Sequence, residues 1–296
     1  MSNYRIDPQC VDCILEKFIN KAPEDVDVET VMDYKLGVLK IIAEQGQNLT
    51  APEIVASITD FKSKMFGKID DFYDVKIKFN ELMLQKESTM EKAIKDSADP
   101  FKTALKTAML GNYIDFGAMY SVSEEKLDEL LQSVEDIKLD ETEYQNLCQE
   151  LKTAKSMVLC TDNCGEIVAD KLLVKQIKKQ FPNVNITVIV RGSAVLNDAT
   201  MEDARQVGLC DVTKVIGNGT GVAGTVIDCL SDEAKAVFNS ADVIISKGQG
   251  NFETLVHCNR NVYYLFLCKC NYFAEKFNKP RLTGMFLNDR RLNENI

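Results

Sequence analysis

Hydrophobic residues recur at helical spacing along the first half of the chain. Between Val28 and Ile42 they lie three and four positions apart, which is typical of an amphipathic helix with one buried face. The next stretch has a start signal as well, because Thr50 is a favourable N-cap and Pro52 suits a first turn. The pattern predicts helices over Val28–Ile42, Pro52–Phe66, Tyr73–Ile94, Pro100–Leu110, Ser123–Val134 and Thr142–Ala154.

The pattern changes near residue 155, where short apolar runs rich in valine, isoleucine and tyrosine replace the helical spacing. These runs predict strands at Met157–Cys160, Ile186–Val190, Thr213–Ile216, Val243–Ser246 and Val262–Leu267. Helical stretches lie between them at Glu166–Lys179, Thr200–Val207, Val222–Phe238 and Phe252–Cys258. Alternating strands and helices predict a mostly parallel sheet with helices on both faces. We therefore expect a mainly helical subdomain over residues 1–154 and a three-layer α/β/α domain over residues 155–296.

In a parallel sheet, ligands bind beyond the carboxyl ends of the strands, so polar residues that follow the strands are candidate site residues. Asp162 and Asn163 follow the first predicted strand, and Asp198 lies in the segment after the second. Carboxylate and amide oxygens are hard ligands, which suit magnesium, manganese or calcium better than zinc. Each residue alone is also compatible with a turn or a helix N-cap. Their occurrence at one edge of the predicted sheet favours a divalent metal site.

A lysine and a glycine-containing turn follow the fourth predicted strand, at Lys247 and Gly248–Asn251. Glycines let backbone N–H groups approach a phosphate, and the lysine and the dipole of the following helix add positive charge. We expect Lys247 to lie at the edge of a cleft, where it contacts phosphate and contributes little to packing. A metal and a phosphate-binding loop at one edge together indicate phosphoryl chemistry.

Glu166 lies one helical turn after Asp162. Two interpretations stay open: a water-orienting base or supporting residue in the same pocket, or a glutamate that only stabilises the first turn of a helix. The nucleophile is also open between a water and Asp162 itself. Haloacid-dehalogenase-type phosphatases use an aspartate at a strand end and need a second aspartate two positions on, where this chain has Cys164. We therefore favour water.

Several segments resemble the damage-control phosphatases, a family of metal-dependent enzymes long catalogued as a domain of unknown function. They occur in order along nearly the whole chain, at Pro8–Cys13, Ala108–Gly117, Asp162–Glu166, Leu196–Thr200, Gly221–Thr225 and Asp242–Glu253. The last of these segments is the most specific, and the cysteine-bearing N-terminus is similar to that of the prokaryotic branch. The resemblance implies a helical N-terminal part beside an α/β/α domain.

The resemblance also implies an activity and a set of site residues. The family hydrolyses phosphate monoesters of sugars, nucleotides or cofactor precursors, often damaged or surplus ones. It implies a divalent ion, magnesium or manganese first and cobalt or nickel as alternatives, bound by Asp162, Asn163 and Asp198. It further implies that Asn112 and Asp115 close the site. The substrate phosphate would be held by the loop of Lys247, Gly248, Gln249, Gly250 and Asn251.

Composition and charge limit the classes of partner that the protein is expected to bind. The net charge is −10 and the pI about 4.9, with no basic stripe, so we expect a small phosphorylated metabolite as the partner rather than nucleic acid. The longest apolar run, Val262–Cys268, is too short to cross a membrane. The N-terminus lacks the apolar core of a signal peptide, which predicts a cytoplasmic protein whose ten cysteines are reduced.

Two other functions are compatible with parts of the sequence. Gly219, Gly221 and Gly224 follow a predicted strand, lie at the start of a predicted helix and match the G-x-G-x-x-G fingerprint of dinucleotide-binding oxidoreductases. However, Asp242 precedes its strand, whereas the ribose-binding acid belongs at the far end of a strand. This fingerprint also sits in the third strand–helix unit rather than in the first, so we regard it as the weaker interpretation.

The second alternative is a cysteine-bound metal. Cys10 and Cys13 are spaced for the first turn of an N-terminal helix, where the helix dipole lowers thiol pKa values. Cys268 and Cys270 end the last predicted strand and could complete a structural soft-metal site. The competing interpretation is a buried cluster of small apolar side chains. His257, the only histidine, is more consistent with packing than with catalysis.

Overall fold

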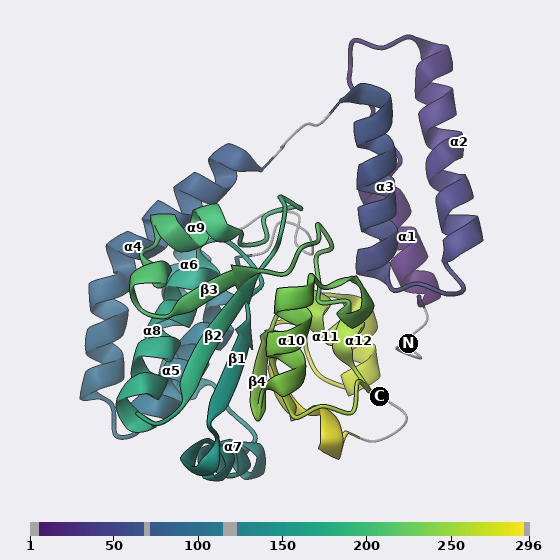
Figure 1. The fold of residues 1–296 in the computed structure, drawn as a ribbon. Helices are drawn as coiled ribbons and strands as arrows, with labels where there is room; N and C mark the ends of the chain where they lie inside the picture. The colour runs from purple at the N-terminus through teal and green to yellow at the C-terminus, as the bar shows by residue number, and fades with distance from the viewer. Residues whose placement is uncertain (1–5, 68–71, 115–122, 293–296) are drawn as a thin grey trace.

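A six-stranded sheet forms the centre of the protein, described by a computed structural model over residues 6–67, 72–114 and 123–292 (Figure 1). The strand order is β3-β2-β1-β4-β5-β6, and only the pairing of β5 with β6 is antiparallel. The strands are β1 (Ser156–Cys160), β2 (Asn185–Val190), β3 (Lys214–Gly217), β4 (Val243–Lys247), β5 (Val262–Leu267) and β6 (Gly284–Asn288). The predicted mostly parallel sheet is therefore confirmed.

Helices cover both faces of this sheet. The helices of the N-terminal half are α1 (Pro8–Phe18), α2 (Val28–Gln45), α3 (Ala51–Phe66), α4 (Tyr73–Asp96), α5 (Pro100–Gly111), α6 (Glu124–Gln132) and α7 (Glu141–Thr153). Those of the C-terminal half are α8 (Glu166–Gln180), α9 (Met201–Gln206), α10 (Asp232–Ser240), α11 (Gln249–Leu255) and α12 (Asn271–Phe277). Short 3-10 turns occur at Val134–Asp136, Leu209–Asp211, Ile227–Cys229 and Asp289–Arg291.

Successive residues of a strand point to opposite faces, and the two faces have separate cores. Met157 and Leu159 of β1 belong to a core shared with α4 to α9, whereas Val158 and Cys160 face α10, α11 and α12. Strands β1, β4 and β5 are buried on both faces, which explains their nearly continuous apolar sequences. This arrangement is the three-layer α/β/α architecture expected from the sequence.

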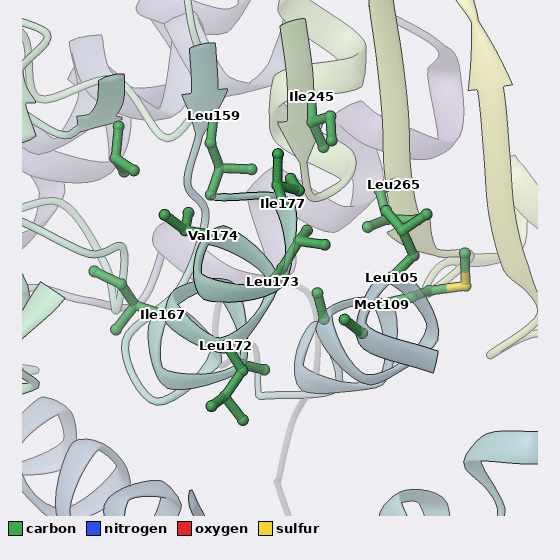
Figure 2. Packing of buried hydrophobic residues seen from close by; sticks show 14 of the residues in the cluster. Leu105, Met109, Leu159, Ile167, Leu172, Leu173, Val174, Ile177, Ile245 and Leu265 are labelled. Atoms are coloured by element: carbon green, nitrogen blue, oxygen red, sulfur yellow. The ribbon is translucent and has the colours of Figure 1, made fainter. Parts of the chain in front are cut away.

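The larger core joins the helical half of the chain to the sheet. Figure 2 shows Leu105 and Met109 of α5 packed beside Leu173 and Ile177 of α8, under the strand residue Leu265. These two helices make the most extensive helix–helix contact in the molecule, and α4 packs on α8 as well. Helices α4 to α7 therefore cover the sheet, although they precede it in the sequence.

The first three helices have a core of their own. Ile14, Tyr34, Val38 and Ile54 are among its buried residues, and the three-helix unit stands beside the sheet domain in Figure 1. Thr50 caps α3 as expected, because its backbone N–H donates to Glu53 Oε2 at 2.9 Å in a capping box. The sequence places a boundary at residue 155, where strands begin, whereas the hydrophobic cores divide the chain between α3 and α4.

Most predicted elements lie within a few residues of the observed ones, with three differences. The helix predicted over Val222–Phe238 is wrong at its start: this segment is a loop and a 3-10 turn, and α10 begins only at Asp232, where Ser231 Oγ accepts a bond from Ala234 N at 3.3 Å. The sequence analysis also missed α12 and β6, which are short. No helix in the described ranges has the length and hydropathy needed to cross a membrane.

The strand order reverses between β1 and β4. The chain leaves β1 towards β2 and β3 on one side, and β4 returns to the other side of β1. At such a switch point the connections diverge and leave a crevice beyond the carboxyl ends of the strands. The loops that follow β1 and β4, starting at Thr161 and Gly248, therefore flank the crevice.

Candidate active site

Backbone hydrogen bonds join the loops that follow β1 and β2. Ala199 N donates to Asp162 O at 2.7 Å, and Asn163 and Asp198 form an isolated antiparallel bridge. Asp162, Asn163 and Asp198 are all buried, and all three line one cavity of about 420 Å³. The three residues predicted to bind metal therefore lie together, although they come from two strand ends.

Neighbouring amides orient the side chains of Asp162 and Asn163. Asp162 Oδ2 accepts hydrogen bonds from Asn163 Nδ2 at 2.7 Å and from Asn112 Nδ2 at 2.9 Å. Asn163 Oδ1 accepts one from Asn197 Nδ2 at 3.0 Å. An amide oxygen has two acceptor positions, so the bond from Asn197 leaves one for a cation. Two carboxylates and an amide oxygen on one cavity wall fit a hard divalent ion.

Lys247 does not lie at the edge of a cleft, and that expectation is wrong. Its side chain is 0% exposed, and Nζ donates to Glu166 Oε1 at 2.6 Å, Asp170 Oδ1 at 2.7 Å and Ala108 O at 2.9 Å. The side chain points from β4 towards α8, because Lys247 alternates with Ser246 across the sheet. These bonds occupy all three donors of the ammonium group.

The ion cluster of Lys247, Glu166 and Asp170 is fully buried. Burial raises the pKa of Asp170 to about 7, although the charge of Lys247 opposes this shift. Burial also lowers the pKa of Lys247, but the two carboxylates outweigh it and raise that pKa above its ordinary value. The lysine is therefore charged at neutral pH, and its positive charge is directed towards the two acids.

Glu166 connects this ion cluster to the candidate metal ligands. While Oε1 accepts the bond from Lys247, Oε2 accepts hydrogen bonds from Asn112 Nδ2 at 2.9 Å and Asn163 Nδ2 at 3.0 Å. Both amides also bond to Asp162 Oδ2. Of the two interpretations of Glu166, this geometry matches a residue that supports the pocket, and its carboxylate has defined partners beyond the helix dipole.

The predicted loop after Lys247 consists of Gly248 and the first turn of α11, and it contributes to the cavity in part. Gln249 and Gly250 line it. The side chain of Asn251 instead forms hydrogen bonds with neighbouring protein groups. Nδ2 donates to Lys247 O at 2.6 Å and Thr161 O at 2.9 Å, and Oδ1 accepts from Thr225 Oγ1 at 2.8 Å. Gly248 has a φ of +82° and lies against Asp162.

The helical half of the chain reaches the site through Asn112, at the end of α5. Asn112 is buried, and besides its bonds to Asp162 and Glu166 its Oδ1 accepts from Leu267 N at 3.0 Å. The structure thus brings Asn112 to the predicted ligands. Asp115, the other residue assigned to this part of the site, lies outside the described residues.

Three residues near the site were given no role by the sequence analysis. Lys269 lines the cavity and is buried, two residues after the end of β5, so the rule applied to the other strand ends would have found it. Asp170 lies four residues after Glu166, on the same face of α8. Arg191 directly follows β2, and its Nε donates to Asp198 Oδ2 at 2.6 Å.

The opposite wall of the cavity comes from the three-helix unit and α12. Gln9, Cys10, Cys13 and Lys17 of α1 line it together with Cys270. Three of the four cysteines considered for a soft-metal site thus face one space, whereas Cys268 is buried and does not line the cavity. The described residues contain no group of three or more histidines, cysteines, aspartates or glutamates arranged to hold a metal.

The N-terminal helix that carries Cys10 and Cys13 is confirmed, with Cys10 in the first turn of α1 as expected and Cys13 in the second turn. The expected low thiol pKa is wrong for Cys10. Burial, followed by the charge of Glu253, raises the pKa of Cys10 to about 12. The helix dipole is outweighed because a thiolate here would be desolvated and close to a carboxylate.

The dinucleotide fingerprint lacks the local structure that it requires. No helix begins at Gly224, and the loop that contains Gly219 and Gly221 packs on other loops. A Cβ at Gly224 would lie 2.7 Å from the side chain of Thr254 and 2.9 Å from Gly250 O. These glycines therefore allow the loop to pack closely on its neighbours, including α11, and a pyrophosphate-binding helix N-terminus does not follow them.

His257 shows no catalytic arrangement. Its backbone N–H donates to Asp289 Oδ1 at 2.7 Å, and the residue adopts a φ of +63° at a turn after α11. The same carboxylate group accepts bonds from Asn259 N and from the hydroxyl of Tyr264. His257 thus belongs to a turn organised around Asp289.

Comparison with known proteins identifies the family. Residues 6–282 match the damage-control phosphatase ARMT1-like domain. The chain is 30% identical over 282 residues to a damage-control phosphatase of Pyrococcus horikoshii, covering 94% of this chain and 96% of that protein. It is 32% identical over 276 residues to a damage-control phosphatase of Archaeoglobus fulgidus, with coverage of 90% and 93%.

A solved structure agrees with these sequence relationships. The crystal structure of a DUF89 family protein from Pyrococcus horikoshii has a TM-score of 0.81 to this chain and 28% sequence identity, covering 96% of this chain and 98% of that one. The likeness extends over both the helical half and the sheet. The chain therefore belongs to the ARMT1-like damage-control phosphatase family.

Proposed function

We propose that this protein is a divalent-metal-dependent phosphatase that hydrolyses phosphate monoesters of small metabolites such as sugars, nucleotides or cofactor precursors, in a damage-control role. One observation carries the proposal: Asp162, Asn163 and Asp198 converge on a single cavity at the switch point of the sheet. Family membership supports the phosphatase part. The hard oxygen donors support magnesium or manganese as the ion, with cobalt or nickel as alternatives.

Asp162, Asn163 and Asp198 would hold the ion, which would supply polarisation of a phosphoryl oxygen and orientation of the attacking water. Glu166 fixes the amides of Asn112 and Asn163, and these amides in turn fix the carboxylate of Asp162. A ligand held in this way loses little rotational freedom when the ion binds. Glu166 and Lys247 therefore serve the reaction through the geometry of Asp162 and Asn163.

The substrate phosphate binds in the cavity beside the metal ligands. Gln249, Gly250 and Lys269 line the wall next to these ligands, and Lys269 brings a positive charge to a cavity that also contains several carboxylates. Such a charge offsets the negative charge of a phosphate dianion as it enters and reacts. A volume of about 420 Å³ suits a molecule of metabolite size.

Release of inorganic phosphate from a panel of phosphorylated metabolites tests this proposal. The protein is first treated with a chelator and dialysed, and each reaction is run with and without Mg²⁺, Mn²⁺, Co²⁺ or Ni²⁺. We expect release only with an added ion. Calorimetric titration with Mn²⁺ is expected to give one site per chain.

Asp198→Ala is the decisive variant, because it removes one carboxylate ligand from the cavity wall. It should lose Mn²⁺ binding and phosphate release while keeping its circular dichroism spectrum. The matched control is Asp96→Ala, at the exposed end of α4, which should behave as the wild type. Full activity of Asp198→Ala, or metal-independent release by the wild type, would show that the assignment is wrong.

A further inference from the structure

Arg191 lies among the loops that carry the candidate metal ligands. Its side chain is 1% exposed, although it directly follows β2 at the edge of the sheet where the cavity opens. Asp162 and Asp198 line that cavity, whereas Arg191 is absent from the described residues of its wall. The guanidinium group therefore reaches the two carboxylates from the protein side, and a substrate in the cavity meets the carboxylates first.

Three nitrogens of this guanidinium group face three different segments. Nε donates to Asp198 Oδ2 at 2.6 Å, and Nη2 lies 3.6 Å from Asp162 Oδ1. Nη1 donates to Asn251 Oδ1 at 3.1 Å, in the first turn of α11. Arg191 thus connects the loops after β1 and β2 with the start of α11 through one rigid planar group.

The surroundings hold Arg191 itself in place. Its backbone N–H donates to Ala199 O at 2.9 Å, and the residue forms an isolated bridge with Thr200, so the backbone directly after Asp198 is fixed. Asn251 is anchored by its own bonds to Thr161 O and Lys247 O. The guanidinium group is therefore a rigid support and does not depend on a bound ligand for its position.

Two carboxylates buried beside each other repel, and each loses hydration. A cation behind them offsets this cost when no metal is bound and keeps both ionised and correctly placed. The two contacts differ: Asp198 has a short hydrogen bond, while Nη2 has no hydrogen-bond partner among the described residues and faces Asp162 across 3.6 Å. A buried nitrogen without a bond favours rotation of the Asp162 carboxylate towards it.

We propose that Arg191 is a positioning residue that sets the separation and orientation of Asp162 and Asp198 before a divalent ion binds. This inference rests on the proposed function, because it assumes that these carboxylates are the metal ligands. The role requires the shape of arginine as well as its charge. A lysine has a single nitrogen, so it cannot reach Asp162, Asp198 and Asn251 from one fixed position.

The test compares wild type, Arg191→Met and Arg191→Lys by calorimetric titration with Mn²⁺ and by thermal unfolding with and without saturating Mn²⁺. We expect Mn²⁺ to bind about 10–100-fold more weakly in both variants, as is usual when a residue supporting a metal ligand is removed. We also expect Arg191→Met to be destabilised mainly without metal, and much of the lost Tm to return when Mn²⁺ neutralises the carboxylates. The control is Arg205→Met, an exposed arginine on α9.

Each outcome has a defined meaning. Wild-type Mn²⁺ affinity in folded Arg191→Met or Arg191→Lys overturns the positioning role while leaving the phosphatase proposal intact. Full recovery of affinity in Arg191→Lys alone overturns the geometric part, since charge is then sufficient. Variants that fail to fold even at saturating Mn²⁺ indicate a purely structural arginine and also overturn it. A wild type that binds no divalent ion overturns both this inference and the proposed function.

Discussion

Gly248 and Asp162 are in contact across the switch point of the sheet. A Cβ atom built on Gly248 would lie 1.9 Å from Asp162 Oδ2 and 2.1 Å from its Cγ. Gly248 also has a φ of +82° and a ψ of 159°, a conformation that is accessible almost only to glycine. The loop after β4 can therefore lie directly against the carboxylate that the loop after β1 presents to the cavity.

Gly248→Ala should disable the metal site, because the added methyl group must displace the carboxylate of Asp162. We expect Mn²⁺ affinity to fall at least tenfold, as for other changes that disturb the orientation of a ligand. Calorimetric titration and phosphate release measure the effect. Gly67→Ala is the matched control: Gly67 has a φ of 84° and a ψ of 167°, but nothing lies within 4 Å of its added Cβ.

The Gly67→Ala control separates the backbone strain of an alanine at positive φ from the collision of the added methyl group with Asp162. Both variants should lose about 1–3 kcal/mol of stability from the strained backbone, and only Gly248→Ala should lose metal binding. Equal metal affinity in the two variants would mean that Asp162 moves aside without consequence, contrary to a ligand role for its Oδ2.

Lys247→Met should destabilise the protein strongly. The substitution leaves Glu166 and Asp170 buried together without their cation, and breaking a buried ion pair by removing one partner costs about 3–5 kcal/mol. Urea denaturation of the metal-free protein measures this loss. Lys92→Met, at an exposed position of α4, should change stability by no more than about 0.5 kcal/mol. A stable Lys247→Met protein with slow turnover would instead support direct contact between Lys247 and the substrate phosphate.

Asp170 should make stability depend on pH. Its pKa is raised to about 7 in the folded protein, mainly by burial, whereas an unfolded aspartate titrates near pH 4. Between these values the native state keeps a proton that the unfolded state has lost. The free energy of unfolding therefore includes a contribution that is complete below about pH 4 and is lost as the pH rises to about 7.

Asp170→Asn should lack this contribution, because the amide carries no titrating proton. Urea denaturation of wild type and variant at a series of pH values gives the difference between their free energies of unfolding. We expect the free energy of unfolding of the wild type to fall relative to that of Asp170→Asn as the pH rises. Asp96→Asn is the control at an exposed position. Parallel curves for wild type and Asp170→Asn would mean that Asp170 is already ionised at pH 4.

Cys10 should react slowly with iodoacetamide at pH 8, because burial and the charge of Glu253 raise its pKa to about 12 and thiolate is the reactive form. Cys13 is exposed and should be alkylated much faster. Peptide mapping by mass spectrometry measures both rates in one sample. Glu253→Gln should speed the alkylation of Cys10, while faster alkylation of Cys10 than of Cys13 in the wild type would contradict the assigned surroundings.

The sequence by itself determined the class of fold and the position of most elements. Hydrophobic periodicity distinguishes buried parallel strands from amphipathic helices, and both signals are local. The same is true of the capping box at Thr50 and of the strand-end location of Asp162, Asn163 and Asp198, because parallel strands necessarily bring their carboxyl ends to one edge. The start of α10 was missed because a glycine-rich loop and a helix start share the same residue types.

Only the tertiary structure decided what these residues touch. Lys247 follows the expected pattern for phosphate binding, yet the alternation of side chains along β4 directs it into the core beside α8, where Glu166 and Asp170 bind it. Arg191, Asn112 and Lys269 reach the site from separate segments, and the atoms that they contact there depend on how these segments pack. Side-chain direction and the packing of distant elements set the charge balance of a buried site, so the site's chemistry depended on the fold as a whole.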